Sequence, residues 1–141
     1  VRQLHEFTVE AAQDFFNTYL QVNDEKAAFF LRELLDRTGK DYRNHCTEFK
    51  TKMSVRGLDS YGTVANELAR AVYAICLKLG IDFTFNSFYT ELRNNNKIDG
   101  NAFNVVDGLE MTFEWHSNGN ATMRLSKALV ADLNAMLVKG E

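Results

Sequence analysis

Three histidines and two cysteines are the side chains of this chain best suited to metal or nucleophilic chemistry: His5, His45, His116, Cys46 and Cys76. No histidine has another histidine two or four residues away, the spacings at which neighbouring zinc ligands commonly stand on a strand or a helix. The cysteines form no Cys-x-x-Cys pair and lie far apart, which favours reduced thiols over a metal site or a disulfide. The sequence therefore predicts no cofactor and singles out no catalytic residue.

Glu48 and Lys50 form the one short arrangement with an enzymatic character. On a strand over 48–56, an acid and a lysine two residues apart would project from the same face. That placement, with Asp41 upstream, resembles the one that nucleases of the restriction-endonuclease type use to hold Mg²⁺ and activate water. Charged side chains on a solvated face produce the same pattern. The sequence contains no phosphate-binding loop, no nucleophile elbow of the Gly-x-Ser-x-Gly type and no EF-hand loop. A Mg²⁺-dependent nuclease at Glu48 and Lys50 is therefore our third hypothesis, and we favour a protein that is not an enzyme.

The segment 37–56 carries a local excess of basic side chains, although the chain as a whole has a formal net charge of −3. Six cations stand there against two acids, interleaved with aromatic rings, a pattern found at nucleic-acid contacts. Long basic stems that cover the rim of a packed helix would look the same. The possible phosphate-contacting residues are Arg37, Lys40, Arg43, Lys50, Lys52 and Arg56. They support our second hypothesis, a nucleic-acid-binding regulator.

Aromatic side chains supply the case for binding to another protein. The chain has 11 phenylalanines, and Phe29, Tyr73 and Phe83 fall off the main apolar stripes of their predicted helices. Off-stripe aromatic residues favour an interface with a partner or a self-association face, and the alternative is that they fill a second core face. Our first hypothesis is therefore a cytoplasmic, non-catalytic interaction module that regulates or inhibits a protein partner.

Four to five amphipathic helices must position these side chains. Apolar residues recur every three to four positions in five stretches, and several stretches follow a capping Thr, Asn or Asp. The predicted helices are 9–21, a helix from 24 that stops before Gly39, 41–53, 63–79 ending at Gly80, and 83–95 capped by Asp82. The stretch 41–56 also alternates with period two at its end, so a strand over 48–56 stays open.

After residue 101 the apolar period changes from 3.6 to two, which indicates strands. The predicted strands are 102–106, 109–116 and 121–125, and a last helix, capped by Ser126, ends at Gly140. The predicted fold class is α+β, with four to five helices followed by a small antiparallel sheet, which contains the hairpin 109–125, and by a C-terminal helix.

Two loops compete to close the hairpin 109–125. A two-residue turn would set apolar side chains opposite polar ones along the whole ladder. A three-residue loop, 117–119, matches the apolar faces and leaves Gly119 in the left-handed conformation. It pairs Trp115 with Ala121, Phe113 with Met123, and Met111 with Leu125. Trp115 should then point into the core and His116 out of it, so these neighbours cannot act as one unit.

The unit 63–125 resembles winged-helix architecture, in which a second helix reads DNA and a hairpin contacts the backbone. The helix 83–95 offers DNA only Arg93 beside Glu91, and the hairpin sets two glutamates against Arg124. These acids would repel phosphate. Winged-helix binding is therefore a second form of the nucleic-acid hypothesis.

We expect one domain over residues 1–141, because 141 residues is an ordinary domain length and no linker divides the chain. Its longest apolar run has seven residues, whereas a helix needs about 20 to span a bilayer. No signal segment opens the sequence. We therefore predict a cytoplasmic protein with no membrane partner.

Overall fold

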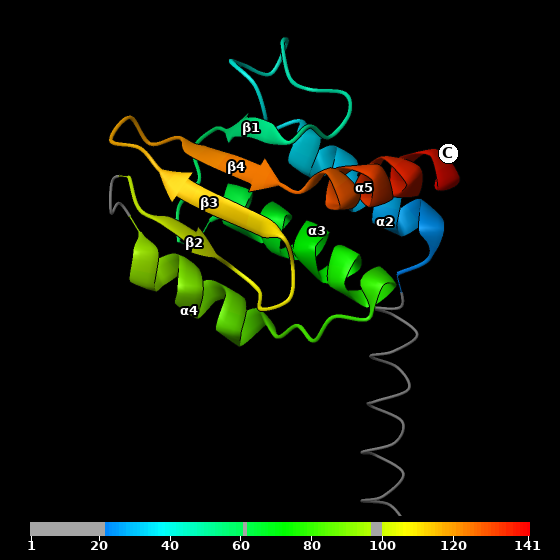
Figure 1. Cartoon of the computed structure of the whole chain (residues 1–141). Helices are drawn as coiled ribbons and strands as arrows, with labels where there is room; N and C mark the ends of the chain where they lie inside the picture. The colour runs from blue at the N-terminus through cyan, green and yellow to red at the C-terminus, as the bar shows by residue number, and fades with distance from the viewer. Residues whose placement is uncertain (1–21, 61, 97–99) are drawn as a thin grey trace, which may run out of the picture.

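A computed structural model describes residues 22–60, 62–96 and 100–141, and Figure 1 shows their arrangement. These residues form four helices and a four-stranded antiparallel sheet, so the predicted α+β class is confirmed. The predicted helix 9–21 lies outside the described residues. The helices are α2 (Asp24–Leu35), α3 (Thr63–Leu79), α4 (Phe85–Asn95) and α5 (Lys127–Lys139). The strands are β1 (Lys52–Val55), β2 (Ala102–Asn104), β3 (Met111–Trp115) and β4 (Ala121–Leu125).

Three helix ends follow the capping residues of the sequence, whereas α2 ends at Leu35, earlier than the predicted stop before Gly39, because Thr38 bridges Val55 of β1. The Asn23 side chain accepts the N–H of Lys26 at the start of α2, where acids in the first turn complement the helix dipole. Ser126 caps α5 in the same way, as predicted. The α3 helix ends at Gly80, whose φ of +70° is a conformation that favours glycine. No helix among the described residues is long and apolar enough to cross a membrane.

Helix α4 begins two residues later than the sequence predicted. Thr84, not Asp82, is its N-cap, and the Thr84 hydroxyl accepts the N–H of Ser87 at 3.1 Å. Both are good capping residues, but Phe83 stays in the connection, where its ring packs edge-on against Tyr73. The prediction of Asp82 as the cap was wrong because this tertiary contact decides which of two acceptable caps is used.

The sheet has the order β1-β4-β3-β2, and its central hairpin has the predicted register. Its pairs are Trp115 with Ala121, Phe113 with Met123, and Met111 with Leu125. Gly119 ends the three-residue loop with a φ of +86°. Its N–H donates to the carbonyl of His116, which closes the loop.

The predicted helix 41–53 was wrong, because residues 41–51 form neither a helix nor a strand and β1 begins at Lys52. Two side chains replace the hydrogen bonds of a helix. Asp41 accepts the N–H groups of Arg43 and Asn44. Asn134 of α5 accepts the N–H of Phe49 at 2.8 Å and donates to its carbonyl at 3.1 Å. The strand β1 then pairs with β4, so the sheet does not lie wholly after the helices as the sequence predicted.

One face of the sheet packs on the helices and the other faces outward. In Figure 1, α3 crosses behind the sheet, α4 lies beside β2, and α2 lies next to α5. Trp115, Phe113 and Met123 point into this core with no more than 1% of their surface exposed, against an α3 face rich in alanine. The indole N–H of Trp115 donates to the carbonyl of Leu58 at 2.9 Å. The residues that alternate with the buried ones along each strand, such as Lys52 and Arg124, form the polar outer face of the sheet.

Candidate functional site: an aromatic surface and an acidic groove

An aromatic surface forms where α2, α3 and the start of α4 meet. It consists of Phe29, Phe30, Tyr73, Phe83 and Phe85. The rings of Tyr73 and Phe85 stack nearly parallel, with centroids 5.3 Å apart. Phe83 packs edge-on against both, at 5.8 Å from Tyr73 and 5.0 Å from Phe85. These are favourable geometries for aromatic pairs, so the cluster is a defined structure and not a chance exposure of single rings.

This aromatic surface reaches solvent at two places. Phe85 is 38% exposed and Phe29 is 56% exposed, whereas Tyr73 and Phe83 are half-buried. A small hollow of about 60 Å³ lies beside Phe85 and is lined by Val22, Lys26, Phe30, Arg70, Tyr73 and Phe85. Phe29 contacts Phe30, with ring centroids 6.0 Å apart. The hollow gives the aromatic surface a concave part as well as protruding rings.

The structure brings together two of the three predicted interface residues. Tyr73 and Phe83 touch directly, whereas Phe29 contacts Phe30 on α2 and neither of the other two. Phe85 was missed, because it starts the helical repeat of α4 and so resembled a core residue. The signal that could have found it is its position next to the helix start, where a first-turn residue is less covered than those that follow.

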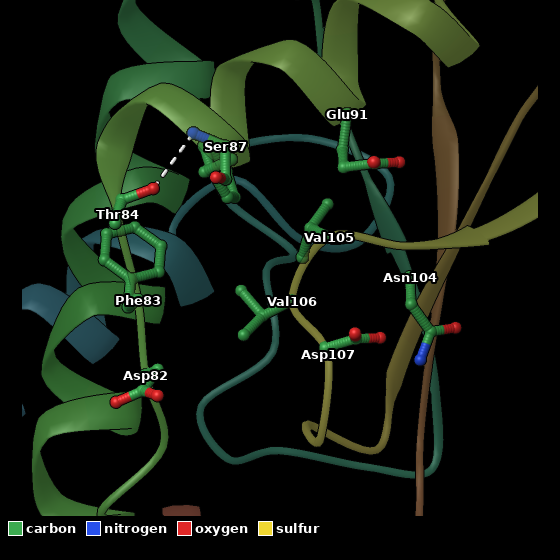
Figure 2. A pocket seen from close by; sticks show the side chains of 10 residues that line it. Asp82, Phe83, Thr84, Ser87, Glu91, Asn104, Val105, Val106 and Asp107 are labelled. Carbon is green, nitrogen blue, oxygen red and sulfur yellow. Dashed lines mark hydrogen bonds between the residues drawn. The ribbon is translucent and has the colours of Figure 1, made fainter.

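An acidic groove of about 430 Å³ runs between the first half of α4 and the segment 104–107, as Figure 2 shows. Its floor is apolar and made by the buried side chains of Phe88, Val105 and Val106. Three exposed carboxylates, those of Asp82, Glu91 and Asp107, surround it. They come from three separate stretches of chain, so no sequence motif predicted that they would lie around one groove.

The charge of the acidic groove is not balanced locally. Among the described residues, no lysine, arginine or histidine lines it, and Asp82, Glu91 and Asp107 form no ion pair. The remaining polar groups are hydroxyls and one amide, from Thr84, Ser87 and Asn104. This groove therefore has a mixed polar and apolar lining and an anionic rim.

Phe83 belongs to both features. Its ring takes part in the aromatic surface, and its side chain also lines the acidic groove, where Figure 2 shows it beside Thr84. The two features are therefore adjoining parts of one surface.

Two of the six predicted phosphate-contacting residues form side-chain hydrogen bonds within the fold. Arg37 donates two hydrogen bonds to the buried Glu67 carboxylate, at 2.8 and 3.0 Å, and these bonds raise the pKa of Arg37. Arg56 donates to the carbonyl of Asp36. The other four, Lys40, Arg43, Lys50 and Lys52, are exposed and form no ion pair with a described residue.

Glu48 and Lys50 are exposed and precede β1, which begins at Lys52. They are therefore not aligned on one face of a strand, as the nuclease hypothesis requires. The described residues contain no group of three or more His, Cys, Asp or Glu side chains that could hold a metal ion. Burial raises the pKa of the Cys76 thiol to about 11, which keeps it protonated and poorly nucleophilic.

Trp115 and His116 lie on opposite faces of the sheet, as the register required. Trp115 is buried, and the Nε2 atom of His116 lies 2.6 Å from the Thr122 hydroxyl on the outer face.

Comparisons of this chain with protein-family models, with curated proteins and with solved structures gave no match.

Proposed function

We propose that this protein is a non-catalytic module that binds a protein partner through the aromatic surface and thereby regulates or inhibits it. The observation that carries the proposal is the stacked pair of Tyr73 and Phe85, with Phe85 open to solvent beside the hollow. Aromatic side chains are enriched at the centres of protein interfaces, where they bury a large area with few rotatable bonds. A partner that covers Phe85 would convert exposed apolar area into contact area.

A photo-crosslinking amino acid in place of Phe85, in the full chain, tests the proposal. Position 138 on α5 is the matched control, because Val138 is 68% exposed and lies outside the aromatic surface. We expect a protein that crosslinks from position 85 and not from position 138. With that partner purified, Phe85→Ala should raise the dissociation constant about tenfold or more, and Val138→Ala should leave it unchanged.

Two other crosslinks would contradict the proposal. A crosslink from position 85 to residues 1–21 of the same molecule would show that the chain covers its own aromatic surface. A crosslink to a second copy, together with a mass that rises with concentration, would make the aromatic surface a self-association face.

Nucleic-acid binding is the second candidate, favoured by the four exposed cations Lys40, Arg43, Lys50 and Lys52. Its winged-helix form is less favoured, because α4 would present the acidic groove to phosphate. Titration with DNA and RNA at low salt separates the candidates, since phosphate contacts strengthen as ionic strength falls. Cleavage of either polymer with Mg²⁺, lost in Lys50→Ala, would instead support the nuclease hypothesis.

A further inference from the structure

We propose that the acidic groove receives a lysine- or arginine-bearing segment of the protein partner. The inference rests on the proposed function and adds the chemistry of the bound segment. Three carboxylates surround the groove, and within 22–60, 62–96 and 100–141 no cation lines it. A positive side chain in the groove would be attracted by these carboxylates, whereas a phosphate or an acidic peptide would be repelled.

The floor of the acidic groove identifies the ligand as a side chain with an apolar stem. The half-buried ring of Phe83 offers apolar surface beside the carboxylates, above the buried side chains of Val105 and Val106. Lysine and arginine bury their methylene stems on such surface while their charged ends stay at the rim. A bare metal ion would gain nothing from this floor. The volume of about 430 Å³ lies within the range of ordinary binding pockets.

The acidic groove is continuous with the aromatic surface, which bears on the residues next to the bound lysine or arginine. Phe83 lines the acidic groove and contacts Phe85, so a segment leaving the groove on that side meets exposed aromatic rings. Aromatic faces accept both apolar side chains and cations. The geometry therefore favours a segment that mixes basic and apolar residues.

Two short peptides serve as probes of the full chain. The first is acetylated Lys-Leu-Lys-Leu-Lys, and the second is its charge-reversed match, Glu-Leu-Glu-Leu-Glu. Binding is followed at low salt by backbone amide shifts in ¹⁵N nuclear magnetic resonance spectra. We expect saturable shifts from the lysine peptide, confined to residues 82–91 and 104–108, and none from the glutamate peptide.

A pair of triple variants with the same change of net charge tests the location. The first, Asp82→Asn with Glu91→Gln and Asp107→Asn, neutralises the acidic groove. The matched control neutralises three exposed acids elsewhere: Glu25→Gln, Asp59→Asn and Asp132→Asn. Exposed ion pairs contribute little each, so we expect about tenfold weaker peptide binding in the first variant and less than about twofold in the control. Glu91→Gln alone, with about a threefold loss, replaces the first variant if its spectrum shows unfolding.

Equal losses in the two triple variants, or shifts spread over the whole surface, would overturn the inference. Binding of the glutamate peptide at the same residues would also overturn it. The proposed function fails separately, because it predicts that Phe85→Ala weakens partner binding. Lysine-peptide binding in the groove together with full partner affinity in Phe85→Ala would keep the groove proposal and remove the aromatic one.

Discussion

Trp115 is the largest side chain of the described core and also makes a polar contact there. Its indole N–H satisfies the carbonyl of Leu58, which lies in the connection between β1 and α3. Trp115→Phe would leave this buried carbonyl without a donor and open a small cavity. We expect the free energy of unfolding to fall by about 2–4 kcal/mol, measured by urea denaturation.

The control for this prediction is His116→Ala, at the neighbouring position on the outer face. His116 is half-exposed, so its loss should cost less than about 1 kcal/mol. Equal destabilisation by the two variants would contradict the opposite orientation of these neighbouring side chains.

Glu33 gives a second prediction, on the dependence of stability on pH. Burial raises the pKa of its carboxyl above the ordinary 4.5, with Arg70 acting in the opposite direction from 3.8 Å. The folded state therefore holds this proton more tightly than the unfolded state. The resulting stabilisation is complete below about pH 4.5 and is lost as the pH rises through the raised pKa.

Glu33→Gln should remove this contribution to the pH dependence. One oxygen of Glu33 is buried with no hydrogen-bond partner among the described residues, so the neutral amide avoids a desolvated charge. Urea denaturation at pH 4 and pH 7 should show a smaller loss of stability with rising pH in Glu33→Gln than in the parent. If the difference in unfolding free energy between pH 4 and pH 7 is the same in Glu33→Gln as in the parent, Glu33 is not the source of this pH dependence.

At the scale of elements, the segment 41–51 shows why the predicted helix failed. The apolar spacing of Tyr42, Cys46 and Phe49 fits a helix, but Tyr42 is 69% exposed and only Phe49 is fully buried. The deciding contacts come from Asn134, far along the chain, and from the edge of β4. The apolar periodicity of residues 41–53 contains no information about either partner.

Asn134→Ala tests that explanation. The variant removes the acceptor for the N–H of Phe49 and the donor to its carbonyl. We expect a loss of about 2 kcal/mol in the free energy of unfolding and faster hydrogen exchange at the Phe49 amide. Asp132→Ala, at an exposed position on the same helix, is the control and should change stability by less than about 0.5 kcal/mol.

At the scale of the whole molecule, the sequence predicted what depends on neighbours along the chain. The start of α2, the ends of α3 and α5 and the loop at Gly119 follow from local caps, periodicity and one glycine conformation. The position of β1 and the cap at Thr84 depend on contacts between distant segments. The acidic groove could not be predicted for the same reason, because Asp107 meets α4 only in the folded chain.

The pairing of β1 with β4 sets an order of events in folding. Residue 55 of β1 pairs with residue 121, whereas β3 and β4 are joined by a short loop. Closing the long connection costs more chain entropy, so the hairpin should form early and β1 should join late. Val55→Ala should then mainly speed unfolding, and Phe113→Leu should slow folding, both measured by stopped-flow kinetics. Until β1 joins, β4 remains an unpaired edge, so the partly folded chain is open to wrong strand pairing during that interval.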